Sequence, residues 1–145
     1  MNINFRTLNL LSMDKISLAG CAIIKDRKIL LLHRIKTGWY ELPGGKIENE
    51  ETAESAAIRE IKEELCVDIK ILSELGKKDF IENDYSMSYT WFQAYLLNDR
   101  QPVIGEPEKF DDLKYIELDK LKEYKLSPNM LNFVDELELG SLGIN

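Results

Sequence analysis

The sequence predicts an α/β protein in which a mixed β-sheet is covered by helices on both faces. Apolar runs of strand length recur along the chain, and short polar turns separate them. Two longer segments, 53–65 and 128–139, have the composition and the start signals of helices. Strands that alternate with sizeable helices favour a sheet with helices on its two faces. At 145 residues, the chain is expected to form one domain over residues 1–145.

The strand-like runs follow one another in a clear order. The predicted strands are residues 16–25, 28–35, 67–75, 77–82, 86–97 and 113–118. Turns at 26–27 and 83–84 separate neighbouring strands, and the first of them makes a hairpin. The run 86–97 is apolar on both faces, so it is expected to be a long central strand. Residues 98–109 are the longest polar connection. Residues 1–14 are weakly patterned, and an extra edge strand and a loose arm are both left open.

The first helix is predicted from its start signal and its composition. Thr52 offers a hydroxyl to the free N–H groups of the first turn, and residues 53–65 contain neither Gly nor Pro. At 100° per residue, Ile58, Ile61 and Leu65 share one arc of this helix. That arc is expected to face a hydrophobic core.

The C-terminal part of the chain is expected to be mostly helical. Residues 119–124 are predicted to form a helical turn. Ser127 can cap a last helix that runs to about residue 139, and Pro128 falls in its first turn. Proline suits that position because its missing N–H would have no partner within the helix.

The first helix also carries a crowded acidic arc. Glu60, Glu63 and Glu64 fall on one side of it, where like charges three and four residues apart repel by a few tenths of a kcal/mol each. Such an arc by itself is most often only a solvated surface. Here a loop with Gly44 and Gly45 precedes it, and glycines let a backbone approach a ligand closely. A hard divalent cation is therefore the natural partner of these carboxylates.

The loop and the helix together resemble a known sequence motif. The matching residues are Gly45, Glu51, Arg59, Glu60, Ile61, Glu63, Glu64 and Val67. They fit the Nudix box, G-x5-E-x7-R-E-U-x-E-E-x-G-U, in which U is aliphatic. The one departure is Cys66, where the family usually has a glycine in a left-handed conformation. A cysteine there costs about 1 kcal/mol, or the helix ends differently.

Resemblance to the Nudix hydrolase family implies an α/β/α sandwich with a mixed sheet. It also implies hydrolysis of a nucleoside diphosphate linked to another moiety, with Mg²⁺ as cofactor and Mn²⁺ as the alternative. The metal ligands implied by the resemblance are Gly45, Glu60, Glu63 and Glu64. A divalent ion would separate the negative substrate from this acidic helix. The candidate catalytic residues are Glu63, Glu64 and Glu108, and which of them is the general base is left open. Glu108 is chosen over Glu106 in a segment that resembles the E-P-E-K segment of relatives, with a solvated loop as the alternative.

Other residues receive supporting or binding roles from the same resemblance. Glu51 and Arg59 resemble a pair that braces the loop against the helix. Arg34 and Lys46 are assigned to substrate binding, with a surface arginine at a strand end as the alternative for Arg34. Asn129 is assigned to base recognition, because its amide offers both a donor and an acceptor. A residue that only bonds the backbone at a helix start is the alternative for Asn129.

The substrate is a separate question, since the box is common to the whole family. The segment from Leu126 to Asn129 resembles a P-x-N segment of oxidised-purine nucleoside triphosphate hydrolases. A purine nucleoside triphosphate, ordinary or oxidised, split to monophosphate and pyrophosphate is therefore favoured. ADP-ribose is one alternative, although Glu82 stands at the position where hydrolases of ADP-ribose usually carry a proline. A dinucleoside polyphosphate is another, although Tyr85 lies one place away from the position of the tyrosine that marks hydrolases of that substrate. A non-catalytic Nudix-fold module that binds nucleotide or a protein partner is the alternative from another class.

Composition limits the remaining options. A net charge of −7 argues against sequence-independent binding to nucleic-acid polymers, which depends on clustered basic residues. Cys21 and Cys66 lack metal-ligand spacing and are expected to be reduced. No apolar run approaches the roughly 18 residues that a membrane span needs, and no targeting leader is apparent, so a cytoplasmic protein is expected. The oligomeric state is left open, with a homodimer among the options.

Overall fold

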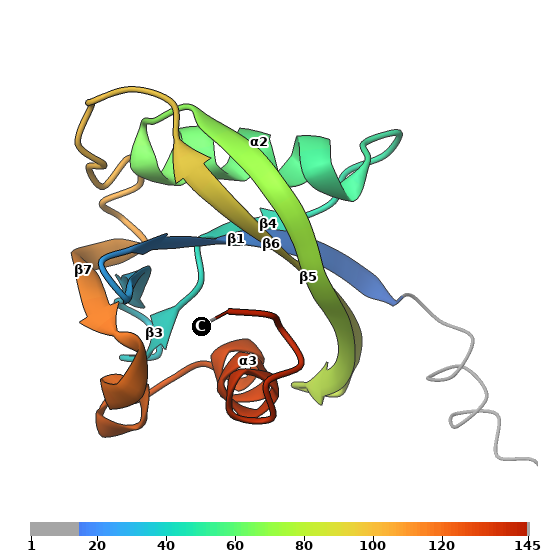
Figure 1. Ribbon diagram of the computed structural model, residues 1–145. Coiled ribbons are helices and arrows are strands. Elements are labelled where there is room, and N and C mark those ends of the chain that lie inside the picture. Colours follow the sequence, from blue (N-terminus) through green and yellow to red (C-terminus); the bar gives the residue numbers. More distant parts are fainter. Residues whose placement is uncertain (1–14, 145) are drawn as a thin grey trace, which may run out of the picture.

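The computed structural model describes residues 15–144, which form a seven-stranded mixed sheet with helices on either side (Figure 1). The strands are β1 (Ile16–Lys25), β2 (Lys28–Arg34), β3 (Tyr40–Glu41), β4 (Gly44–Lys46), β5 (Ile69–Glu82), β6 (Tyr85–Leu96) and β7 (Phe110–Glu117). The helices are α2 (Ala53–Leu65), the 3₁₀ helix η1 (Leu118–Glu123) and α3 (Pro128–Glu138). None of the helices in the described part of the chain is long and apolar enough to cross a lipid bilayer.

Strand β1 lies at the centre of the sheet. On one side it pairs in parallel with β6, from Ile16 to Ile23. On the other side it pairs antiparallel with β4 and, at its last two residues, with β2. The order is β3-β2-β1-β6-β5, with β7 added on β2. The run predicted to be the central strand is β6, which lies between β1 and β5, one place in from the edge.

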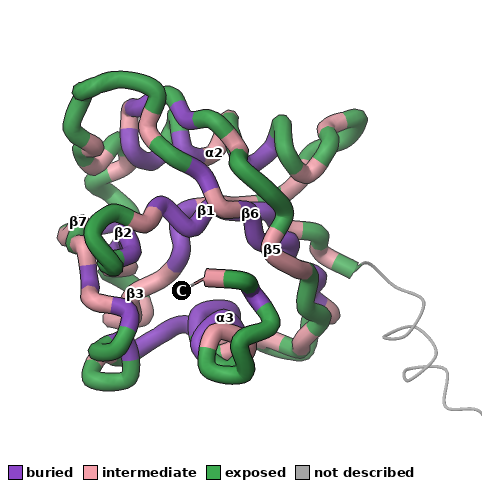
Figure 2. Tube along the Cα trace, in the orientation of Figure 1, coloured by how far each residue is buried: buried purple, intermediate pink, exposed green. Residues whose placement is uncertain are grey.

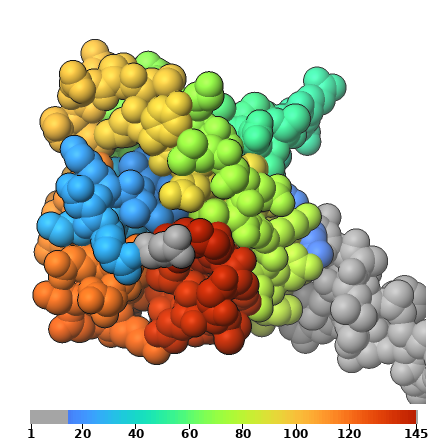
Figure 3. All heavy atoms as spheres, in the orientation of Figure 1, coloured from blue at the N-terminus to red at the C-terminus, as the bar shows by residue number. Residues whose placement is uncertain are grey.

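The two faces of the sheet carry separate hydrophobic cores. On one face, α2 buries Ala57, Ile61 and Leu65 against the sheet. On the other, η1 and α3 bury residues such as Leu121 and Phe133. Figure 2 shows buried residues along β1 and in α3, and Figure 3 shows α3 in red beside β5 in yellow-green. The predicted mixed sheet between helices, an α/β/α sandwich, is confirmed.

The prediction that Ile58 faces the core is wrong. Ile58 is 40% exposed, whereas the residues of α2 that are buried include Ala57, Ile61 and Glu64. These three residues lie within one arc of the helix, displaced from the predicted arc towards the acidic side. The displacement draws Glu64, a residue of the acidic arc, into the interior.

The strand boundaries differ from the prediction in several places. One strand, β5, replaces the two that were expected on either side of Gly76. Bulges between Ile71 and Ser73 and between Glu74 and Gly76 absorb the irregular pattern while pairing with β6 continues. Strand β7 begins earlier than predicted, and the short strands β3 and β4 were not predicted, because two or three residues show no alternation. Residues 1–14, for which an edge strand and a loose arm were both left open, lie outside the described residues.

Both ends of α2 follow the local chemistry of the sequence. The Thr52 hydroxyl accepts a hydrogen bond from the N–H of Ser55, and the Thr52 N–H donates to the Ser55 hydroxyl at 3.0 Å. The predicted N-cap is therefore confirmed. At the other end, the backbone of Cys66 is left-handed, with φ 58° and ψ 34°. Of the two possibilities for this position, a strained left-handed cysteine and a helix that ends differently, the first therefore occurs.

Replacing Cys66 by glycine is expected to raise the free energy of unfolding by about 1 kcal/mol, because glycine lacks the Cβ that makes this conformation unfavourable. Urea denaturation measures the change. Cys66→Ala is the matched control, since it removes the same sulfur but keeps a Cβ. Equal stability of the two variants would contradict the strain.

Candidate active site

The glycine loop lies directly against the acidic side of α2. Pairing of β4 with β1 sets Gly44 opposite Gly20 and Gly45 opposite Ala19. A Cβ at Gly45 would lie 2.5 Å from the carboxyl carbon of Glu60, so a larger residue at this position would displace the Glu60 carboxylate. The loop and the helix of the sequence motif therefore meet face to face.

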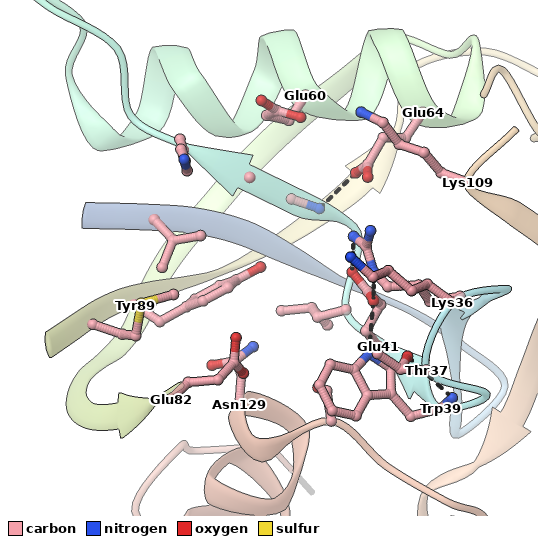
Figure 4. A pocket seen from close by; sticks show the side chains of 18 of the residues that line it. Lys36, Thr37, Trp39, Glu41, Glu60, Glu64, Glu82, Tyr89, Lys109 and Asn129 are labelled. Carbon is pink, nitrogen blue, oxygen red and sulfur yellow. Dashed lines mark hydrogen bonds and ion pairs between the residues drawn. The ribbon is translucent and has the colours of Figure 1, made fainter. Parts of the chain in front are cut away.

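Glu64 is the most unusual residue of this contact. It is only 3% exposed, and its Oε1 accepts a hydrogen bond from the N–H of Gly44 at 2.7 Å (Figure 4). Burial raises its pKa well above the ordinary value, the Gly44 hydrogen bond opposes the shift, and the charge of Glu60 adds to it. Among residues 15–144, no cationic side chain forms an ion pair with Glu64. Buried carboxylates without a counter-ion are characteristic of functional sites.

Arg59 ties the loop to the helix. Its Nε donates to Glu51 at 2.8 Å and its Nη2 donates to the other Glu51 oxygen at 2.9 Å. Nη2 also reaches the carbonyl of Lys46, while Nη1 reaches Glu60 at 3.0 Å and Glu63 at 3.3 Å. The hydrogen bonds from Arg59 lower the pKa of Glu51 to about 2. The contact predicted between Glu51 and Arg59 is thus present.

A cavity of about 530 Å³ opens beside this contact. Its acidic wall beside α2 consists of Glu60, Glu64 and Glu106, and Glu41, Glu48 and Glu82 add further carboxylates to the lining. Its basic side chains are Arg34, Lys36, Lys46 and Lys109. In Figure 4 the carboxylates of α2 lie at one end of the cavity, and Asn129 and Trp39 lie at the other. Glu82 is labelled beside Asn129 at that second end, so both ends of the cavity carry carboxylates.

Most of the residues predicted to bind metal or substrate or to act in catalysis line this cavity, and two do not; the predicted supporting pair, Glu51 and Arg59, also lies outside the lining. Those that line it are Gly45, Glu60, Glu64, Arg34, Lys46 and Asn129. Glu63 is not part of the lining; its side chain is 49% exposed and accepts hydrogen bonds from Arg59. Glu108 is the second residue that the cavity does not include.

The structure places Glu106, and not the predicted Glu108, in the lining of the cavity. Glu106 lines the cavity, whereas Glu108 is exposed to solvent. The carbonyl of Glu106 accepts hydrogen bonds from the N–H groups of Lys109 and Phe110, so the intervening residues form a tight turn that carries Glu108 outward. The charge of Glu106 also helps to raise the pKa of Glu60 and Glu64, in agreement with its place on the acidic wall.

Several lining residues were missed by the sequence analysis. Arg34 is held by Glu41, which accepts from its Nε and, at 2.9 Å, from its Nη2. Glu41 also accepts from the indole N–H of Trp39 at 2.9 Å. Trp39 and Glu41 are two residues apart, and residues two apart in an extended segment share a face. That spacing was the signal by which these two lining residues could have been found. Tyr89 also lines the cavity, and burial raises its pKa well above normal.

The carboxylate oxygens beside the cavity are ligands that a hard cation prefers, but they are not gathered into one metal-binding group. No three or more Asp, Glu, His or Cys side chains in the described residues are grouped closely enough to hold a metal ion. Arg59 accounts for this, because it already binds Glu60 and Glu63. The cavity still presents carboxylate oxygens, which Mg²⁺ prefers, and Glu64 lacks any other counter-ion.

Comparisons with known proteins agree with the motif and the fold. Residues 15–137 match the family model described as NUDIX domain. The chain is 32% identical over 107 residues to "Putative 8-oxo-dGTP diphosphatase 2" of Mycobacterium tuberculosis, which covers 68% of this chain and 69% of that protein. It is 49% identical over 57 residues to "ADP-ribose pyrophosphatase" of Methanocaldococcus jannaschii, covering 37% of this chain. That match spans 34% of the relative, and other curated relatives are likewise spanned over only 28–38% of their length.

A solved structure extends the similarity to the whole fold. The crystal structure of a MutT NUDIX hydrolase from Burkholderia pseudomallei superposes with a TM-score of 0.77 and 28% identity, over 85% of this chain and 98% of that one. Proteins with this domain are hydrolases that generally use a divalent metal and act on small nucleotide substrates. Because the family model matches most of the chain, and the loop and helix that carry its motif face a cavity, this protein belongs to the Nudix hydrolase family.

Proposed function

We propose that this protein hydrolyses a purine nucleoside triphosphate, ordinary or oxidised, to the monophosphate and pyrophosphate with Mg²⁺. The buried carboxylate of Glu64 carries the proposal, because it faces the cavity without a counter-ion. Basic side chains lie in the same cavity. A polyanion and a cation bound together would neutralise both sets of charges, whereas either one alone would leave a like-charge repulsion.

The metal would be held by carboxylates of α2 and by the glycine loop. Glu60 and Glu64, with Glu63 and the carbonyl of Gly45, are the proposed ligands, and Mn²⁺ is the alternative ion. When bound, the ion neutralises phosphate oxygens and lowers the pKa of a coordinated water. Arg59 must then yield Glu60 and Glu63 to the metal, so Arg59 and the metal compete for the same oxygens.

The other side chains would hold the phosphates and accept the proton. Glu41 fixes the guanidinium of Arg34 through Nε and Nη2, which leaves Nη1 without a hydrogen bond among residues 15–144. That nitrogen and the Lys46 ammonium are the proposed phosphate donors. A glutamate of the acidic wall, either one of α2 or Glu106, accepts the proton of the attacking water.

The alternatives differ in what occupies the end of the cavity at Asn129. The relative from Mycobacterium tuberculosis, matched over two thirds of this chain, supports a nucleoside triphosphate. The relative named ADP-ribose pyrophosphatase supports a diphosphate that links two sugars. Incubation with a nucleotide panel in Mg²⁺ and in Mn²⁺, with pyrophosphate and phosphate release both recorded, separates them. Pyrophosphate from a purine triphosphate is the expected result, and no release from any nucleotide would support a non-catalytic module.

Replacing the carboxylate of Glu60 or of Glu64 should have different effects on catalysis and on folding. Glu60→Gln and Glu64→Gln are expected to lower kcat by about a hundredfold or more, because a metal ligand is lost. In metal-free buffer at pH 8, Glu64→Gln should instead raise the free energy of unfolding by about 1 kcal/mol or more, since an uncompensated buried charge disappears. Turnover and urea denaturation measure the two effects.

Glu54→Gln is the matched control, because Glu54 lies on the same helix and is exposed to solvent. It should keep normal turnover. Near-normal turnover of both Glu60→Gln and Glu64→Gln would remove these residues from the proposed metal site.

Metal binding should stabilise the folded protein. An ion that binds only the folded state adds RT ln(1 + [L]/Kd), about 2.7 kcal/mol at one hundred times Kd. Thermal unfolding in Mg²⁺ or Mn²⁺, against sodium chloride of equal ionic strength, measures the gain. The double variant Glu60→Gln/Glu64→Gln should lose most of it. A gain of equal size in the double variant would place the ion elsewhere.

A further inference from the structure

The hydroxyl of Tyr89 is a buried polar group that the described part of the chain leaves unpaired. Tyr89 is only 6% exposed, and its ring belongs to the hydrophobic core that the sheet shares with α3. Among residues 15–144, its Oη atom forms no hydrogen bond and no ion pair. Such a group is unfavourable unless water or a ligand satisfies it. The hydroxyl therefore has a free place for a partner from outside the chain.

The Oη atom of Tyr89 opens into the cavity. It is not one of the fully enclosed unpaired oxygen atoms of the described residues, so solvent reaches it. Tyr89 lines the cavity, and in Figure 4 its side chain lies between the carboxylates of α2 and Asn129. The hydroxyl is therefore accessible from the space that a substrate would fill.

Two glycines leave room for this hydroxyl. Strand β1 lies between β4 and β6, and β6 carries Tyr89. A Cβ at Gly20 of β1 would collide with Oη and with the carbonyl oxygen of Pro43. A Cβ at Gly44 of β4 would lie 2.5 Å from Oη. Tyr89 thus reaches across β1 to the glycine loop, and a side chain at either glycine would displace the hydroxyl or the backbone beside it.

The hydroxyl lies near the acidic end of the cavity and keeps its proton there. Burial raises the pKa of Tyr89 well above its ordinary value, and the negative charges of Glu64 and Glu41 add to the shift. A phenol is protonated at neutral pH even without such a shift. Tyr89 is therefore a hydrogen-bond donor in this place and not a general base.

We infer that Tyr89 contacts the substrate, and that its hydroxyl donates a hydrogen bond to an oxygen of the phosphate that carries the sugar; this inference rests on the proposed function. A neutral donor near the acidic end assists phosphate binding without adding another charge to the site. A hydrogen bond from such a donor is stronger when the acceptor is an anionic oxygen.

The charges of the cavity favour a phosphate at Tyr89 over a phosphate farther from α2. The pKa of Arg34 is raised by its hydrogen bond to Glu41 and also by the charge of Glu64, so Arg34 and Tyr89 lie near the same carboxylate. Glu82 lies beside Asn129 at the other end, where its charge would repel a phosphate. The phosphate next to the sugar is therefore expected between these two ends, within reach of the hydroxyl.

Tyr89→Phe removes the hydroxyl and keeps the ring in the core. It should lower kcat/KM for the nucleotide that the panel identifies by about tenfold to a hundredfold, the loss typical of one hydrogen bond to a charged group. The melting temperature without ligand should stay the same or rise, because the hydroxyl has no partner in the chain to lose. Tyr95→Phe is the matched control, since Tyr95 lies on the same strand, is 42% exposed and does not line the cavity. It should keep normal kcat/KM.

Calorimetry with two ligands identifies the group that Tyr89 contacts. Deoxyguanosine monophosphate has the phosphate next to the sugar but no anhydride bond to cleave, and deoxyguanosine lacks the phosphate. In Mg²⁺, Tyr89→Phe should weaken binding of the monophosphate by about tenfold or more and leave binding of the nucleoside unchanged. Equal losses for both ligands would place the contact on the sugar or the base and overturn the inference.

The remaining outcomes separate the inference from the proposed function. Hydrolysis by the wild-type protein with near-normal kcat/KM in Tyr89→Phe would overturn the inference and leave the proposed function standing. A lower melting temperature of Tyr89→Phe with unchanged affinity for the monophosphate would make the hydroxyl structural and would also overturn the inference. Absence of hydrolysis of any nucleotide, with an affinity for the monophosphate that falls in Tyr89→Phe and not in Tyr95→Phe, would support the contact and contradict the proposed function.

Discussion

The burial of Glu64 against the backbone of Gly44 is the constraint on which the site depends. The hydrogen bond at 2.7 Å requires the glycine loop to lie close to α2, and β4 achieves this by pairing with the central strand β1. It also requires the helix to turn its acidic side inward, which leaves Ile58 exposed. The fold therefore gives up an apolar contact and accepts a buried acid. Such a local conflict between stability and charge is expected at a functional site.

Arg59 makes this acidic arrangement stable before any ligand arrives. One guanidinium satisfies Glu51 with two hydrogen bonds and also reaches Glu60 and Glu63. The like-charge repulsion along the helix is thus relieved from within the chain. Glu64 is beyond the hydrogen bonds of Arg59, and its carboxylate remains the uncompensated one. Arg59 thus holds three of the acids by hydrogen bonds, although its single positive charge does not neutralise all of them, and it leaves the fourth, Glu64, without a counter-ion.

Local signals in the sequence were sufficient for α2 and for its N-cap, whereas the contact between Glu51 and Arg59 was expected from the family resemblance. These features depend on neighbours within about one or two helical turns. The features that were missed depend on tertiary contacts. Glu106 lines the cavity and Glu108 does not, because a turn closed by backbone hydrogen bonds separates the two residues. The bond between Trp91 and Asn129 joins residues 38 positions apart, so no local pattern could indicate it.

The two ends of the cavity are built from different parts of the fold. One end consists largely of α2 and β4, where Gly45 lies close to the carboxylate of Glu60. The other end depends on how α3 is seated on β6, where the indole N–H of Trp91 donates to the amide oxygen of Asn129. A substitution at Trp91 or Asn129 alters this contact without touching the carboxylates of α2. The motif that identifies the family therefore covers only the first end, and the contact between β6 and α3 lies outside it.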